Sequence, residues 1–139
     1  MQRLRVGIDL DAPASAVWAY VADIPSHVEW MHDARSITFT SPTTFDCLTV
    51  VGPFRTVDHM EIVEWVEGSV IGIRHVGLVR GTGRFVVTPL GSSRTRFEWD
   101  EELDFPWWMV PPVARFVLRQ VWRRNLRSLA SRVHSSPKR

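Results

Sequence analysis

The chain has 139 residues, of which 45% are apolar, and its 17 basic and 15 acidic residues leave a formal net charge of +2. This length suits one compact core and is too short for two, so residues 1–139 are expected to form a single domain. The small net charge lacks the concentrated basic surface that a row of phosphates requires, which excludes nucleic acid as the expected partner.

The first residues and the hydropathy of the chain predict a cytoplasmic protein. The N-terminal residues contain no apolar signal region, and no run of about 18 apolar residues is present that would span a membrane. The single cysteine, Cys47, can form neither an internal disulfide nor a multi-thiolate metal site. We therefore expect a cytoplasmic protein with no integral membrane segment.

One strand and two short helices are predicted at the start of the chain. Apolar residues alternate with polar or small ones over residues 4–10, which is typical of a strand with one buried face. Pro13 then begins a short helix that runs to about Val21. Pro25 separates it from a second short helix that carries Trp30 and its neighbours. Neither helix is long enough to be stable alone, so both must pack against a larger element.

The middle of the chain predicts an antiparallel meander. Turn-like segments such as "SPTT", "VEGS" and "TPLGSS" separate runs rich in Val, Ile, Thr and aromatic residues. Six strands fit this spacing: 34–40, 43–51, 55–66, 69–79, 83–89 and 94–103. The glycine pair in "RGTGR" lies between two such runs and not between a strand and a helix, so it is interpreted as a hairpin turn and not as a phosphate loop.

After "DFPWWMVPP" the periodicity becomes helical, and residues 112–134 predict one long helix. It carries a broad apolar stripe and, on a neighbouring face, four arginines at intervals of four: Arg115, Arg119, Arg123 and Arg127. Residues 135–139 are expected to be a frayed tail. This helix is the only element long enough to cover the concave face of a twisted sheet.

Three segments carry a resemblance to a known family: "APASAVWAYVADIPSHVEWM", "EWVEGSVIGIRHVGLVRGTGRFVVTPLGSSRTRFEWDEEL" and "RRNLRSLASRV". Over residues 3–134 the chain resembles the SRPBCC or START-type helix-grip superfamily of birch-pollen allergens, polyketide cyclases/dehydrases and lipid-transfer domains. The resemblance implies an α+β helix-grip fold, in which a seven-stranded curved antiparallel sheet and the C-terminal helix enclose a cavity. It also implies that the two short helices form a V that closes one end of the cavity, with Trp18 and Trp30 as core residues there.

Two polar residues stand out as candidates for chemistry in the cavity. Glu101 alternates with inward-facing aromatic residues on the last strand, and His75 shares a face with Ile71 and Ile73. One intervening strand separates them, which predicts side chains roughly 10 Å apart, at the two ends of a ligand. The alternative interpretations are a Glu101 at the rim, solvated or paired with a helix arginine, and a His75 that is purely structural.

Nine residues are predicted to contact a ligand: Trp65, His59, His75, Phe85, Phe97, Trp99, Glu101, Met109 and Val117. For His59 the alternation does not decide which face is inward. The spacing of His27 and His32 does not place both on one helical face, and no carboxylate completes a site, so neither a metal nor another cofactor is expected.

Three function classes remain open at the level of the sequence. The first is the binding of a small hydrophobic molecule that is lipid-like, quinone-like or polyketide-like. The second is a polyketide cyclase or dehydratase in which Glu101 or His75 moves a proton. The third is a protein-partner module with a largely filled cavity. Trp107 and Trp108 are expected either to gate the cavity mouth, to contact a membrane surface or a protein partner, or simply to pack under the start of the long helix. The chain is expected to be a monomer or homodimer.

Overall fold

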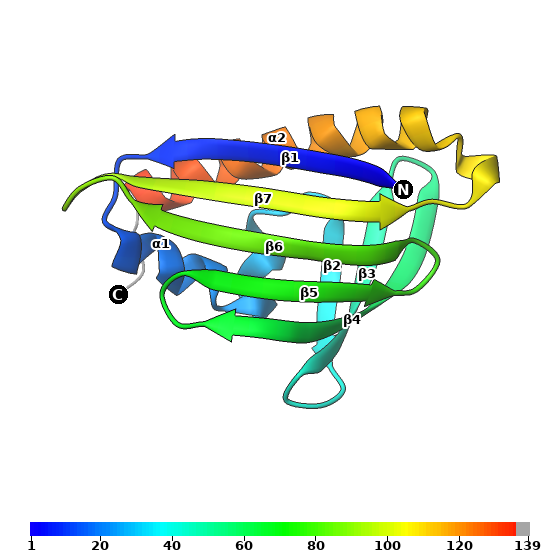
Figure 1. Cartoon of the computed structure of the whole chain (residues 1–139), viewed down its shortest axis with the longest axis horizontal. Helices are drawn as coiled ribbons and strands as arrows, with labels where there is room; N and C mark the ends of the chain where they lie inside the picture. Colours follow the sequence, from blue (N-terminus) through cyan, green and yellow to red (C-terminus); the bar gives the residue numbers. More distant parts are fainter. Residues whose placement is uncertain (136–139) are drawn as a thin grey trace.

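The computed structural model describes residues 1–135 and is built on a seven-stranded antiparallel sheet with the strand order β1-β7-β6-β5-β4-β3-β2 (Figure 1). The strands are β1 (Gln2–Leu10), β2 (Ala34–Phe39), β3 (Thr44–Val51), β4 (Phe54–Val66), β5 (Val70–Val76), β6 (Arg80–Pro89) and β7 (Thr95–Asp104). The helices are α1 (Ala14–Val21), the 3₁₀ helix η1 (Ile24–Glu29), the 3₁₀ helix η2 (Trp107–Met109) and α2 (Pro111–Ser135). This order confirms the predicted helix-grip architecture.

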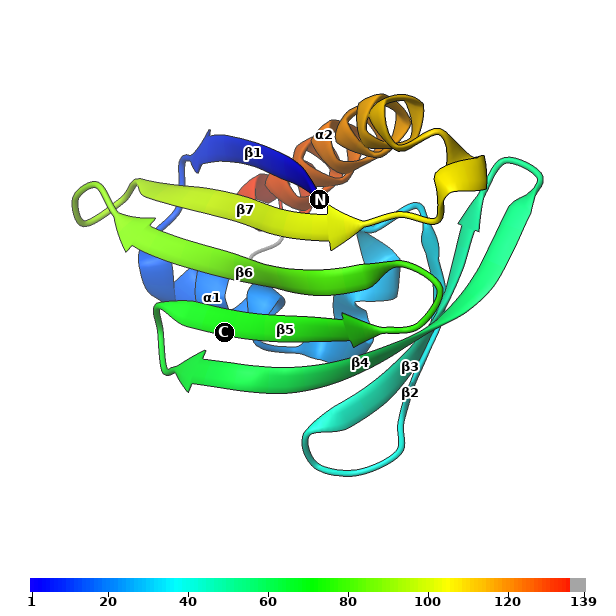
Figure 2. The same cartoon turned by 45° about the vertical axis from the view of Figure 1, so that its right-hand side comes forward.

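The sheet is strongly curved, and α2 lies across its concave side. The strand register shifts between Ala34 and Ser36 in β2 and between Ile62 and Glu64 in β4. Such bulges bend a strand and increase its twist. Figure 2 shows the result: the β3–β4 hairpin turns away from the plane of β5, β6 and β7, and its tip approaches η2. The space between the sheet and the helix is therefore deepest near the N-terminal half of α2.

Burial along α2 divides the helix into two parts. Its C-terminal half packs tightly onto the sheet through four buried side chains: Trp122, Leu126, Leu129 and Val133. In its N-terminal half, Val113, Phe116 and Val117 are exposed. The closed hydrophobic core consequently lies under the second half of the helix, and the first half covers an open cavity.

The two short helices pack into the core as expected. Trp18 and Trp30 are both buried members of the main hydrophobic cluster, which confirms that they are core residues. The Trp18 indole N–H donates to Oε1 of Glu67 at 2.9 Å and so ties α1 to the β4–β5 turn. The second helix is a 3₁₀ helix that ends at Glu29, just before Trp30. Pro25 lies near its start, and at six residues it is longer than most 3₁₀ helices.

The interpretation of "RGTGR" as a hairpin turn is wrong. The segment lies inside β6, which begins at Arg80, and the turn occupies residues 77–79. Gly81 has φ +147°, and a Cβ at this position would run into the backbone of Glu102 on β7. The glycine is needed because the two strands approach closely, and not because the chain reverses.

The predicted frayed tail, residues 135–139, lies outside the described residues apart from Ser135, the last residue of α2. None of the helices in residues 1–135 is both long and apolar enough to cross a membrane.

Candidate functional site

A cavity of about 410 Å³ lies between the concave face of the sheet and the N-terminal half of α2. Its walls come from η1, from strands β2 to β7, from η2 and from α2. Most lining side chains are apolar, among them Ile37, Phe45, Phe54, Met60, Ile71, Ile73, Phe85, Leu103, Met109 and Leu118. A concave, mainly apolar space with a few polar groups is the usual form of a site for a small molecule.

The mouth of the cavity lies between the β3–β4 hairpin and the start of α2. Trp108, Val113 and Val117 line the cavity and are also exposed to solvent, which marks the opening. The ring of Phe54 lies 6.3 Å from that of Trp108, so the hairpin and η2 meet at one side of the mouth. Trp107 projects beside it and is 85% exposed.

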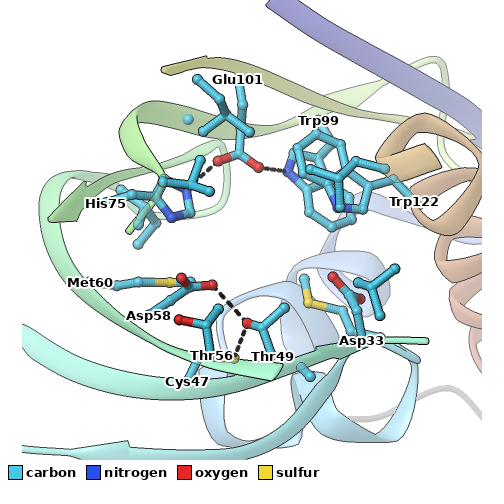
Figure 3. Close-up of a pocket in the computed structure, with 18 of the residues that line it drawn as sticks. Asp33, Cys47, Thr49, Thr56, Asp58, Met60, His75, Trp99, Glu101 and Trp122 are labelled. Atoms are coloured by element: carbon cyan, nitrogen blue, oxygen red, sulfur yellow. Dashed lines mark hydrogen bonds and ion pairs between the residues drawn. The ribbon is translucent and has the colours of Figure 1, made fainter. Parts of the chain in front are cut away.

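His75 and Glu101 form a hydrogen-bonded pair inside the cavity (Figure 3). His75 Nε2 contacts Oε1 of Glu101, and the indole N–H of Trp99 donates to Oε2 of the same carboxylate at 2.7 Å. Glu101 is only 4% exposed, so the alternative that it lies at the rim, solvated or paired with an arginine of the helix, is wrong. Both carboxylate oxygens are occupied by partners from the sheet itself.

The predicted separation of roughly 10 Å between His75 and Glu101 is also wrong, and Gly83 explains why. Strand β6 does lie between β5 and β7, but it presents Gly83 opposite Glu101. A Cβ on Gly83 would lie 2.6 Å from Cδ and 2.7 Å from Oε1 of Glu101. Because this position carries no side chain, the Glu101 side chain crosses above β6 and reaches His75.

The pair changes the titration of His75. Burial alone lowers the pKa of this imidazole, whereas the Glu101 carboxylate, the hydrogen bond to it and the charge of Asp58 raise it. Together, the effects that raise the pKa exceed the effect of burial, so the pKa of His75 lies above its ordinary value of 6.5. At neutral pH the imidazole therefore carries more positive charge than a free histidine does.

A second polar group lies on the opposite wall, on β3 and β4. Thr49 donates to Oδ2 of Asp58 at 2.7 Å, and Cys47 is paired with Asp58 across the two strands. Burial raises the pKa of Asp58, and it raises the pKa of the Cys47 thiol to about 11. The β4 alternation was too mixed to predict an inward Asp58, so the sequence reasoning missed this group.

Asp33 completes the polar lining just before β2. Asn125 of α2 donates to Oδ1 of Asp33 at 2.7 Å, and its own Oδ1 accepts the backbone N–H of His32 at 2.8 Å. Burial raises the pKa of Asp33, and the charges of Glu101 and Asp58 raise it further. The fully buried Asn125 thus connects α2 to the segment before β2 through these two hydrogen bonds. No sequence motif indicated this role.

The aromatic wall next to Glu101 consists of two stacked indoles. The rings of Trp99 on β7 and Trp122 on α2 lie 4.3 Å apart with an interplanar angle of 13°. Both residues line the cavity. The stack connects the sheet to the helix where the cavity ends and the closed core begins.

Six of the nine predicted ligand-contacting residues line the cavity: His75, Phe85, Trp99, Glu101, Met109 and Val117. The other three do not. His59 is exposed on the outer face of the sheet, where its Nδ1 lies 2.6 Å from Oδ1 of Asp46. Trp65 packs edge-on against Trp18 at the closed end, and Phe97 is fully buried in the core beyond the cavity. Trp65 pairs with the cavity-lining Ile71, and the bulge between Ile62 and Glu64 separates it from His59, so these two odd-numbered residues of β4 do not share a face.

No cluster of three or more His, Cys, Asp or Glu side chains that could hold a metal ion occurs in residues 1–135. The Glu101 carboxylate is engaged by His75 and Trp99, and Asp58 stands across the cavity from it (Figure 3). The arrangement suits hydrogen bonding and proton transfer to an organic molecule.

A curved antiparallel sheet that packs around a long C-terminal helix defines the helix-grip class of folds. The sequence profile of the family described as "Polyketide cyclase / dehydrase and lipid transport" matches residues 1–134. The chain belongs to this family. No curated protein matches the sequence.

Solved structures share the fold at low sequence identity. A START superfamily protein from Mycobacterium smegmatis is 17% identical with a TM-score of 0.81, and the match covers 95% of this chain and 97% of that one. The ZhuI aromatase/cyclase from Streptomyces sp. R1128 is 16% identical with a TM-score of 0.76, covering 97% and 96%. A protein from Thermus thermophilus is 15% identical with a TM-score of 0.82, covering 99% and 100%. At such identities the likeness shows the fold.

Proposed function

We propose that the protein binds a small hydrophobic molecule in the cavity between the sheet and α2. The observation that carries this proposal is the open, mainly apolar cavity of about 410 Å³. Each 100 Å² of ligand surface removed from water contributes roughly 2.5 kcal/mol, which must exceed the entropy lost on association. The partner-module alternative assumed a largely filled cavity and receives no support from this geometry.

Native mass spectrometry of the purified protein, compared with denaturing extraction of the same sample, is the first test. A released apolar molecule of defined mass supports the proposal. The second test fills the cavity: Thr56 lines it, so Thr56→Phe is expected to abolish binding of that molecule. Thr38→Phe places the same side chain on an exposed position of β2 and is the control. Equal affinity of the two variants would contradict binding in this cavity.

A second candidate function is proton transfer at a substrate held in the same cavity, and the His75–Glu101 pair favours it. A histidine oriented by a carboxylate and facing an apolar space is an arrangement that general acid–base catalysis uses. Such a site would remove or return a proton next to a carbonyl group, as cyclisation or dehydration of a polyketide-like chain requires.

This second candidate is tested by the exchange of the α-protons of an aryl ketone in D₂O, followed by NMR. Wild-type protein is expected to accelerate deuterium uptake, and His75→Gln is expected to remove about 10²-fold or more of that acceleration while the ketone still binds. The same variant of the exposed His59, His59→Gln, serves as control. Exchange that is no faster than in buffer excludes this activity for ketones of that kind.

The exposed aromatic residues at the mouth lead us to propose transient contact with a lipid surface. Trp107 and Trp108 lie beside the cavity opening, and interfacial indoles are typical of membrane contact. Sedimentation with phosphatidylcholine vesicles that contain anionic lipid is expected to retain the wild-type protein and to lose Trp107→Ala/Trp108→Ala. Leu90→Ala, at an exposed apolar position in the β6–β7 turn, is the control, and equal retention of both variants would argue against this surface.

A further inference from the structure

The ionisable groups of the cavity are mainly acidic. Three carboxylates line it, from Asp33, Asp58 and Glu101, and the imidazole of His75 lies on the same walls. His75 is bonded to Glu101. Asp33 and Asp58 accept hydrogen bonds from Asn125 and Thr49, which are neutral. Two carboxylates thus lack a bonded cationic partner among the described residues.

The other basic side chains that line the cavity direct their polar groups elsewhere. The guanidinium of Arg84 donates to Glu64 on the outer face of the sheet, at 3.0 Å from Nε to Oε1. His27 places Nε2 at 2.8 Å from the backbone oxygen of Val21. Neither neutralises Asp33 or Asp58.

The carboxylates of Asp33 and Asp58 also interact electrostatically with Glu101. Burial raises the pKa of both aspartates, and the charge of Glu101 raises it further in each case, whereas the charge of His75 lowers the pKa of Asp58. Figure 3 shows Asp58 on the strand wall across the cavity from the Glu101–His75 pair, and Asp33 on the side of Trp122. Like charges in an apolar enclosure are unfavourable, and a bound cation would relieve this repulsion.

Two indole side chains also line the cavity, on the side of Glu101. Trp99 and Trp122 form the stacked wall next to Glu101. The face of an indole attracts ammonium groups, most strongly where water is excluded. Carboxylates and indoles together, within an apolar enclosure, are the two kinds of group that recognise an organic cation.

We propose that the ligand of this cavity is an apolar molecule with a protonated amine, held at Asp58 and Asp33 beside the Trp99–Trp122 stack. This inference rests on the proposed ligand-binding function and names its ligand class. A fatty acid or other carboxylate ligand is disfavoured because its anionic head would meet three carboxylates, and the imidazole of His75 is already paired. A neutral alcohol gains a hydrogen bond but no charge attraction.

The test compares three ligands that differ only in their polar group: phenylbutylamine, phenylbutanol and phenylbutyrate. Isothermal titration calorimetry on the wild-type protein at neutral pH and low salt is expected to show the amine binding about tenfold or more tightly than the alcohol. The carboxylate is expected to bind most weakly. Because this ranking is measured on the wild-type chain, it does not depend on whether a variant folds.

Two variants that each remove one negative charge show whether the preference for the amine comes from the carboxylate in the cavity. Asp58→Asn removes a cavity carboxylate, keeps an acceptor for Thr49, and is expected to abolish most of the amine preference while the alcohol binds as before. Asp46→Asn removes an exposed carboxylate on the outer face of the sheet and should leave the preference unchanged. An alcohol that binds as tightly as the amine, or equal effects of both variants, overturns the inference and leaves the proposed function standing. If none of the three compounds binds, and no apolar molecule is released in the mass-spectrometric test, both proposals fail.

Discussion

The substitution Gly83→Ala tests the geometry of the His75–Glu101 pair most directly. A methyl group on Gly83 would lie 2.6 Å from Cδ of Glu101, far inside the van der Waals distance between two carbons. The Glu101 side chain must therefore move, and its hydrogen bonds to His75 and Trp99 move with it. The substitution changes the position of the pair without changing the chemistry of either member.

The magnitude follows from the bonds that are lost. A hydrogen bond to a charged group contributes about 1.5–3 kcal/mol, so loss of one or both predicts that Gly83→Ala lowers the free energy of unfolding by roughly 1.5–6 kcal/mol. Without the Glu101 side chain the steric conflict disappears. Alanine is then preferred to glycine inside a strand by about 0.5–1 kcal/mol. In a Glu101→Ala background, Gly83→Ala is consequently expected to be neutral or slightly stabilising.

Urea unfolding followed by far-UV circular dichroism, on the two single variants and the double variant, measures this coupling. The expected coupling free energy is about 2 kcal/mol or more. Gly7→Ala in β1 is the matched control, because its methyl group would lie at an ordinary 3.5 Å from the backbone oxygen of Phe97. If Gly83→Ala costs the same in both backgrounds, or costs no more than Gly7→Ala, the reasoning about the pair is refuted.

Three further predictions concern stability and reactivity. The pKa of His75 is raised above 6.5 and that of Asp58 above 3.8, so both hold protons more tightly in the folded state. The stabilising effect of protonated His75 and Asp58 is fully present when the pH is below the ordinary pKa of each group. It is lost as the pH rises through the raised pKa of the folded state. Asp58→Asn should therefore flatten the decline of the urea midpoint above about pH 4, and a slope identical to that of wild type would contradict this. Val110 has φ 48°, a left-handed conformation that costs a β-branched residue about 1–3 kcal/mol. Val110→Gly is therefore expected to keep or raise the Tm, whereas Val113→Gly, inside α2, is expected to lower it. The reverse order of the two Tm values would show that Val110 is unstrained. The pKa of the Cys47 thiol is raised from 9.0 to about 11, so the folded chain is expected to react with iodoacetamide at least about 100-fold more slowly than the chain in urea. Mass spectrometry measures both rates. Comparable rates would place the thiol outside the cavity wall.

Local patterns in the chain were sufficient to predict the architecture. The alternation along β7 correctly placed Phe97, Trp99 and Glu101 on one buried face, because a strand repeats every two residues whatever packs against it. The long helix was predicted at 112–134 and runs from Pro111 to Ser135 for the same kind of reason. Periodicity failed where the strand itself is irregular, as in β4, whose bulge at Ile62 and Glu64 shifts the inward face.

The amino-acid sequence by itself determined the order of the elements and the placement of Glu101 on the same face of its strand as Phe97 and Trp99. Only the tertiary structure decided which side chains contact Glu101. Its contact with His75 depends on the register of three strands and on the missing side chain at Gly83, and Asp33 reaches Asn125 across 92 positions of the chain. Such partners are set by how the sheet curves around the helix, because hydrogen bonds between side chains extend only about 3 Å and no local period specifies them.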